Sequence, residues 1–172
     1  MKHRIAVAAA VCLASASIAF AMPARVTDFA DRDFSVRDIV SSLNPSRTRG
    51  LTIGEDEAAS RKISLQLRFG RNSAELTADA KRRLDVVGAA LNAADLANAN
   101  LVVSGHTDIT GSYEHNLLLS QRRAQAVKDY LVSAHDVASE RLKAVGRGPN
   151  DLLDEANPRS PANRRVQLAV AG

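Results

Sequence analysis

The chain has 172 residues, of which 45% are hydrophobic but only 3% aromatic, and its formal net charge is +4. This length allows one ordinary domain with accessory segments, and the scarcity of aromatic residues means that Leu, Val, Ile and Ala must build its core. The small positive charge, with no run of basic residues interleaved with aromatics, argues against nucleic-acid binding.

The N-terminus has the pattern of a secretory signal peptide. Lys2 and Arg4 are followed by an uncharged, mostly apolar run from residue 5 to residue 21, which ends in Ala-Phe-Ala. A positive start, an apolar run and small residues at the end precede signal cleavage. We therefore expect a signal peptide over residues 1–21, export from the cytoplasm and a net charge of +2 after cleavage. The alternative is an uncleaved membrane anchor, for which the run is short.

The single cysteine, Cys12, lies inside this apolar run. Val11 precedes it and the apolar run continues beyond it, so we do not expect it to carry a lipid. The processed chain would then contain no cysteine and would need no disulfide in an oxidising compartment.

Residues 22–60 are interpreted as a linker. They contain two prolines, two glycines, scattered charges and no sustained periodicity, which is typical of a mobile tether. One short amphipathic stretch, residues 34–43, can form a helical turn or two that docks on the domain or on a partner.

The pattern of a folded domain begins at residue 61 and continues to residue 172. Apolar residues alternate with polar ones up to Phe69, which predicts a strand with one buried face. Thr77 then precedes a stretch to about residue 93 with apolar residues at helical spacing. A more buried strand follows from Leu101 and ends at the sequence Gly-His-Thr-Asp, residues 105–108.

The second half of the domain repeats this alternation of elements. A polar loop leads into a long helix that ends near residue 134, and residues 141–146 read as a short strand. A polar loop with prolines precedes a final alternating strand over residues 165–170. The expected fold is α+β: a βαβαββ sandwich with two helices packed on one face of a small mixed sheet.

A binding site is predicted at the end of the second strand of this domain. Asp108 lies at the carboxyl end of that strand, and Gly105 and Gly111 bracket it. Asn116 and Arg123 are seven residues apart, so they lie on one face of the following helix. A carboxylate and a guanidinium at one loop suit a zwitterionic ligand, because Asp108 can accept from an ammonium while Arg123 holds a carboxylate with two hydrogen bonds. An internal salt bridge between these two residues, or two unrelated surface charges, explains the same pattern.

Several motifs in the domain stand at fixed spacings from Asp108. They comprise a Gly-His-Thr-Asp turn, a glycine, an asparagine and a helix containing Leu-Ser and Arg-Ala, with an Asn-Arg-Arg-Val segment near the C-terminus. In this chain they are Gly105 to Asp108, Gly111, Asn116, Leu119-Ser120, Arg123-Ala124 and Asn163 to Val166, preceded by Phe69 and the segment Asn72 to Leu76.

Over residues 62–170 this pattern resembles the OmpA-like peptidoglycan-binding domain, found in OmpA, Pal and MotB type proteins. The resemblance implies non-covalent binding of peptidoglycan at the diaminopimelate of its stem peptide, in the periplasm, and tethering of envelope components to the wall near the outer membrane. It implies no cofactor and no catalysis. Its chief ligand contacts would be Asp108 and Arg123, and the other residues lining the pocket would be Asn72, Thr110, Asn116 and Arg164.

Other residues invite functional interpretations that we do not favour. His106 has no further His, Cys or carboxylate at ligand spacing in its stretch, so we expect a hydrogen bond to the turn and no metal. Ser120 lacks the context of a nucleophile, and Arg165 is expected to be a solvated surface charge. One departure from the family is Gly70-Arg71, where an acidic residue would follow Phe69.

Two other functions stay open at this stage. The chain can be a structural subunit of a larger envelope assembly, with residues 22–60 contacting an outer-membrane or other envelope protein. It can also be an enzyme acting on the wall with Asp108 as acid or base. A carboxylate beside an arginine has a lowered pKa and is a poor general acid, and no second carboxylate accompanies it at a suitable spacing.

Overall fold

The computed structural model describes residues 26–29, 32–44, 61–70 and 72–171. The predicted signal peptide, residues 1–21, lies outside this part of the chain.

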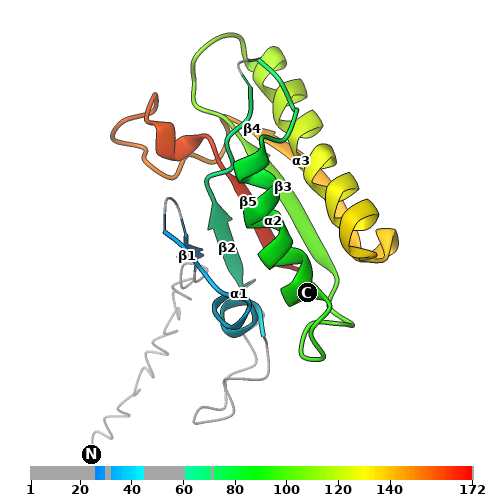
Figure 1. Cartoon of the computed structure of the whole chain (residues 1–172). Helices are drawn as coiled ribbons and strands as arrows, with labels where there is room; N and C mark the ends of the chain where they lie inside the picture. The colour runs from blue at the N-terminus through cyan, green and yellow to red at the C-terminus, as the bar shows by residue number, and fades with distance from the viewer. Residues whose placement is uncertain (1–25, 30–31, 45–60, 71, 172) are drawn as a thin grey trace, which may run out of the picture.

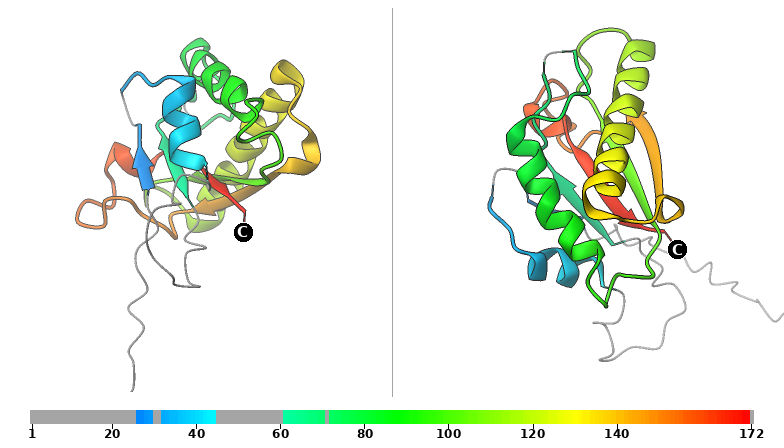
Figure 2. Two further views of the ribbon diagram at one scale, coloured as in Figure 1. Left: turned by 90° about the horizontal axis from the view of Figure 1, so that it is seen from below. Right: turned by 45° about the vertical axis from the view of Figure 1, so that its right-hand side comes forward.

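The described residues form a two-layer α+β sandwich with three helices on one face of a five-stranded sheet (Figures 1 and 2). The order of the strands in the sheet is β1-β2-β5-β3-β4. The strands are β1 (Val26–Asp28), β2 (Lys62–Leu65), β3 (Leu101–His106), β4 (Leu142–Gly148) and β5 (Val166–Val170). The helices are α1 (Val36–Leu43), α2 (Ala78–Leu91) and α3 (Tyr113–His135).

The sheet is mixed, as expected. Strand β3 pairs in parallel with β4 and antiparallel with β5, and β5 pairs antiparallel with β2. Alternation along each strand turns one set of side chains toward the helices, so Ile63 and Leu65 of β2 and Leu168 of β5 are fully buried. The predicted α+β fold is therefore confirmed, with its element order from β2 to β5.

The core is aliphatic, as the composition requires. Within the described residues, Phe29 is the single aromatic member of the buried cluster, which otherwise consists of Leu, Val, Ile and Ala. The helices begin where polar caps precede apolar runs. The side chain of Thr77 accepts from the amide of Ala80 at the start of α2, and Ser112 accepts from His115 at the start of α3.

The first strand of the predicted domain is shorter than its alternation suggested. Strand β2 ends at Leu65, and Phe69 forms an isolated bridge with Leu76. The chain turns back on itself between these two residues, so the alternation continues beyond the point where a neighbouring strand is available.

The interpretation of residues 22–60 as a tether does not hold for their described part. Val26–Asp28 adds an edge strand to the sheet, and α1 packs on the domain with Ile39 and Leu43 fully buried. A capping box between Ser35 and Asp38 starts this helix. The stretch was underestimated because the amphipathic pattern covers only two turns and lies among residues typical of linkers.

In the described part of the chain, no helix combines the length and the apolar character needed to cross a membrane.

We predict that α1 contributes to the stability of the domain. Ile39→Ala should lower the free energy of unfolding by about 2–5 kcal/mol, because it leaves a cavity at a fully buried site. Val36 lies on the same helix but is 37% exposed, so Val36→Ala should cost less than about 1 kcal/mol. Urea unfolding of the two variants measures both values, and equal small losses would show that α1 is not part of the folded unit.

Candidate functional site

Asp108 lies where β3 ends and the loop to α3 begins. Two backbone hydrogen bonds hold the end of the strand, one from His106 N to the carbonyl of Arg165 (2.9 Å) and one from Thr107 N to the carbonyl of Gly148 (3.0 Å). The backbone that leads to Asp108 is thus held by β4 and by the segment before β5, which fixes where its carboxylate emerges.

The loop after Asp108 is a tight turn stabilised from both sides. The amide of Thr110 donates to Asp108 Oδ1 at 2.9 Å, and Gly111 adopts a positive φ of 98°. Asn116, buried in the first turns of α3, donates through Nδ2 to the carbonyls of Thr110 (3.0 Å) and Asp108 (3.4 Å). The predicted residue Asn116 therefore shapes the loop that presents Asp108, and Thr110 reaches Asp108 through its backbone amide.

Helix α3 approaches the sheet closely because two glycines face it. A Cβ atom at Gly105 would lie 2.2 Å from the carbonyl oxygen of Ser120, and one at Gly146 would lie 2.6 Å from the amide of Gln121. Ser120 Oγ also accepts from the amide of Gly148 at 2.9 Å. Ser120 is therefore a structural residue, as expected, and Gly105 serves close packing rather than a turn.

Asp108 forms an ion pair, but its partner is Arg164 rather than Arg123. Arg164 Nη1 donates to Asp108 Oδ2 at 2.8 Å, and the two side chains are 48% and 10% exposed, respectively. The internal salt bridge considered from sequence thus exists with another arginine. An ionised carboxylate has about four acceptor positions, so the bonds from Thr110 and Arg164 leave room for a further donor.

The environment keeps Asp108 ionised. Burial by itself raises the pKa of this carboxyl, but the hydrogen bonds from Arg164 and Thr110 outweigh it, and the pKa of Asp108 lies below its ordinary value of 3.8. The ionised pair therefore stabilises the fold at pH values above that ordinary value, and the stabilisation is lost as the pH falls through the lowered pKa.

Arg123 comes from α3, lies close enough to Asp108 for their charges to interact, and is held by the segment after β2. Its Nε donates to the carbonyl of Ser73 at 3.1 Å, and its guanidinium lies 4.9 Å from the centre of the Phe69 ring. Burial, followed by the charge of Arg164, lowers its pKa, while Asp108 opposes this shift. No acceptor in the described part of the chain contacts the terminal nitrogens of Arg123, so they stay available for a ligand.

Asn72 lies at the edge of this arrangement. It is exposed, has a positive φ of 52°, and precedes Ser73, whose carbonyl accepts from Arg123. Its turn thus adjoins the pocket, whereas no hydrogen bond joins its side chain to Asp108 or Arg123 in the described structure.

The structure adds a residue that sequence reasoning did not single out. Asn163, completely buried, accepts through Oδ1 from the amides of Leu153 and Asp154, and Nδ2 donates to three carbonyls, those of Asp154, Asn157 and Pro158. These bonds fold the long loop before β5 around one amide. Arg164 follows directly, so the loop sets the direction from which Arg164 meets Asp108. The Asn-Arg-Arg-Val motif contained this residue but gave no indication of its partners.

Arg165 and His106 are both buried. Arg165 is only 3% exposed and donates to the carbonyl of Asp151, so the expectation of a solvated surface charge is wrong. His106 is also buried, and burial lowers its pKa to about 4. The described residues contain no cluster of His, Cys, Asp and Glu suited to a metal.

Residues 68–165, more than half of the chain, match the OmpA family. The chain belongs to the OmpA family. Outer membrane protein A of Yersinia pseudotuberculosis is 35% identical over 115 residues, which cover 60% of this chain and 32% of that protein. Peptidoglycan-binding protein ArfA of Mycobacterium tuberculosis is 38% identical over 104 residues, which cover 59% and 31%. The chain thus spans about a third of the length of these two relatives.

Solved structures share the fold. The OmpA-like domain of FopA1 from Francisella tularensis has a TM-score of 0.55 at 28% identity, over 69% of this chain and 76% of that one. The cell wall anchor of the T6SS from Pseudomonas aeruginosa has a TM-score of 0.54 at 27% identity, over 67% and 84%. The peptidoglycan-associated lipoprotein from Burkholderia pseudomallei has a TM-score of 0.50 at 28% identity, over 62% and 87%.

We predict that Arg164→Gln raises the pKa of Asp108. The substitution removes the largest contribution that lowers this pKa and leaves burial, which raises it. Titration of the Asp108 carboxyl by NMR should give a midpoint below 3.8 in the unmodified protein and a higher midpoint in the variant. An unchanged midpoint would show that the two side chains do not interact in solution.

We also predict that Asn163→Ala loosens the loop before β5. Five backbone groups of the loop lose their partner, so the free energy of unfolding should fall by about 2–4 kcal/mol. Amide hydrogen exchange should accelerate most at Leu153 and Asp154. Asn157→Ala, at an exposed position of the same loop, is the control and should leave these two amides protected.

Proposed function

We propose that this chain binds peptidoglycan non-covalently in the pocket between Asp108 and Arg123, and so anchors an envelope component to the wall. Membership of the OmpA family supports this proposal, as does similarity to a relative named peptidoglycan-binding protein and to a solved cell wall anchor. The expected place of action is the periplasm, next to the outer membrane, which agrees with the names of the outer membrane relatives.

The observation that carries the proposal is an ionised carboxylate, Asp108, near an arginine, Arg123, whose terminal nitrogens have no acceptor among the described residues. The pKa of Asp108 is lowered, so the group is a carboxylate at neutral pH. The Nε atom of Arg123 is anchored to Ser73, which leaves the outer edge of the guanidinium for an acceptor. A ligand with an ammonium and a carboxylate on one carbon complements both groups.

Diaminopimelate of the stem peptide has this chemistry at its free end, and it is the ligand we propose. Its ammonium would donate to Asp108 and its carboxylate would accept from Arg123. Arg164, half-exposed beside Asp108, adds a second positive charge that attracts the other carboxylates of a stem peptide. Asn116 and Thr110 would act by holding the loop, and Asn72 would border the pocket.

Binding is favoured over catalysis by the same electrostatics. A general acid needs a pKa near the working pH, whereas that of Asp108 is lowered. The other alternative, a structural subunit that contacts its partner through residues 22–60, is weakened for α1, because the apolar face of this helix is buried in its own domain.

Sedimentation with purified sacculi tests the proposal. The unmodified protein should pellet with the sacculi, and Asp108→Asn and Arg123→Gln should each weaken binding about ten-fold or more, because each removes a charged hydrogen bond. Arg122→Gln is the matched control, since Arg122 is the exposed neighbour on the same helix.

Two results would contradict this assignment. Equal binding by Asp108→Asn and Arg122→Gln would place the site elsewhere, provided that thermal unfolding shows both variants to be folded. Soluble muropeptides released from sacculi by the pure protein would show catalysis.

A further inference from the structure

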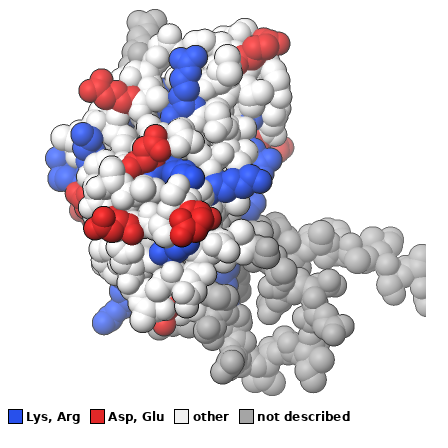
Figure 3. All heavy atoms as spheres, turned by 90° about the vertical axis from the view of Figure 1, so that its right-hand side faces the viewer, with Lys and Arg blue, Asp and Glu red and all other residues white. Residues whose placement is uncertain are grey.

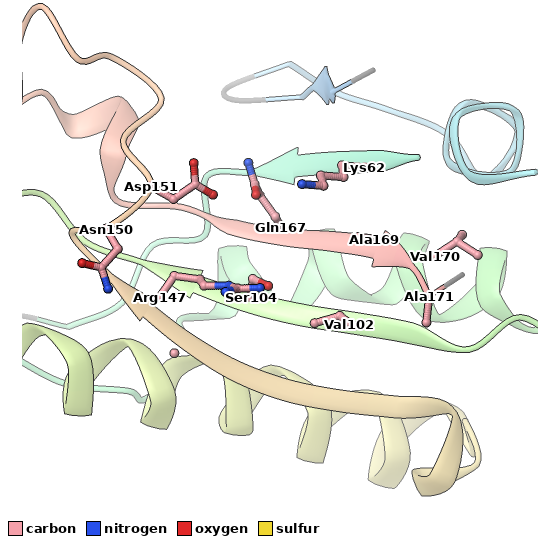
Figure 4. A pocket seen from close by; sticks show the side chains of 11 residues that line it. Lys62, Val102, Ser104, Arg147, Asn150, Asp151, Gln167, Ala169, Val170 and Ala171 are labelled. Atoms are coloured by element: carbon pink, nitrogen blue, oxygen red, sulfur yellow. The ribbon is translucent and has the colours of Figure 1, made fainter. Parts of the chain in front are cut away.

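The face of the sheet without helices carries a groove that the proposed function does not use. It has a volume of about 680 Å³ and runs along β5 and β3. Figure 4 shows side chains from β2, β3, β4 and β5 around it. Its polar lining residues are Lys62, Ser104, Arg147, Asn150, Asp151 and Gln167.

The floor of this groove is polar, although it belongs to the middle of a sheet. Gln167 of β5 is paired with Ser104 of β3 on one side and with Ser64 of β2 on the other. Of these three residues, Gln167 and Ser104 line the groove, and both are more than nine-tenths buried. Buried polar side chains need hydrogen-bond partners, so this floor suits a polar ligand.

The amide of Gln167 is oriented by two residues beside the groove. We assign the amide orientation that satisfies both neighbours, in which its nitrogen donates to His106 Nε2 at 3.2 Å and its oxygen accepts from Arg165 Nε at 3.0 Å. Burial keeps the pKa of His106 at about 4, so this ring is neutral and can accept through Nε2. An amide nitrogen carries two hydrogens, and His106 takes one, so Gln167 has a second donor for a ligand.

The charges around the floor favour an anion. Lys62 and Arg147 line the groove, and neither has an ion-pair partner within the part of the chain that the structure describes. Asp151 is the acidic lining residue, and it lies 3.9 Å from Arg165. Two cations and one carboxylate leave the lining with a net charge of +1.

The other end of the groove is apolar and extends along the strand. It is lined by Val102, Ala169 and Val170, beyond the polar end at Gln167. From Gln167 to Ala171 a strand advances roughly 13 Å, which accommodates about four residues of an extended chain. A ligand that fits both ends is elongated, with an anionic group at one end and small apolar groups at the other.

We propose that this groove binds an extended acidic peptide segment of a partner protein. A glutamate or aspartate side chain of the segment lies between Lys62 and Arg147 and accepts from Ser104 and Gln167. A small apolar side chain of the segment then packs on Val102 and Ala169. The site is separate from the pocket of Asp108, so it gives the chain a second contact that does not depend on wall binding.

NMR titration of the full chain with the peptide Ac-Ala-Glu-Val-Glu-Ala-NH2 tests the proposal. Saturable shifts are expected at the amides of Ser104, Gln167 and Ala169. The isosteric peptide with glutamines in place of the glutamates should bind at least about five-fold more weakly, because it lacks the charge.

Variants of Lys62 and Arg147, the two cations that line the groove, test whether the peptide binds there. Lys62→Gln and Arg147→Gln should each weaken binding of the acidic peptide about three- to ten-fold. Lys143→Gln is the control, because Lys143 is exposed and its neighbour in the sheet is Val102, but it does not line the groove.

The proposal is overturned if no shift saturates, if both peptides bind equally, or if the two groove variants bind like the control. It is also overturned if sodium acetate produces the same shifts with the same affinity, which would indicate a simple anion site. Equal shifts with a soluble muropeptide would assign the groove to the wall instead. If both proposals are right, Asp108→Asn loses sacculus binding. The same variant then shows the same shifts at the groove with the acidic peptide as the unmodified protein.

Discussion

The candidate site depends on how closely α3 lies against β3 and β4. At Gly105 and Gly146 any side chain would enter the backbone of Ser120 and Gln121, since an added Cβ would come within 2.2 and 2.6 Å of it. Interiors are too densely packed to absorb such an overlap without a shift of the helix. This contact brings the first turn of α3 beside the end of β3, and only there can Asn116 reach the carbonyls of the Asp108 loop.

The close packing at Gly105 and Gly146 thus determines the electrostatic environment of Asp108. A carboxylate in this place is largely buried, which alone would favour its neutral form. The turn held by Asn116 supplies the amide of Thr110, and the loop folded around Asn163 supplies Arg164. One donor is a backbone amide and the other a guanidinium, and the segments that carry them are both arranged by buried side-chain amides. Charges are interspersed over the α3 side of the surface, with both signs close together (Figure 3). The proposed attraction of an ionic ligand therefore rests on this local arrangement and not on a surface of one sign.

Much of the fold was predictable, because periodicity marks elements whose one face is buried. The elements from β2 to β5 and the cap at Thr77 follow from sequence, whereas α1 was only one alternative for an amphipathic stretch, since two turns among linker-like residues give a weak pattern. Asp108 and Arg123 were predicted to belong to one site because a single loop and helix join them in the sequence. The ion pair between Asp108 and Arg164 was not predicted, because 56 residues separate the two partners in the sequence and spacing carries no information over such a distance. The burial of Arg165 likewise depends on residues of other segments.

Arg164 and Arg165, adjacent in the segment before β5, contact residues on opposite sides of the sheet. Side chains alternate across a strand, and here Arg164 meets Asp108 whereas Arg165 contacts Gln167 beneath the helix-free face. The register of β5 decides this division, because a shift by one residue would exchange the two arginines. That register is set by Leu168, which is fully buried under the helices and pairs with Ile63 and Val103. The same aliphatic contact that stabilises the core therefore assigns one guanidinium to Asp108 and the other to Gln167.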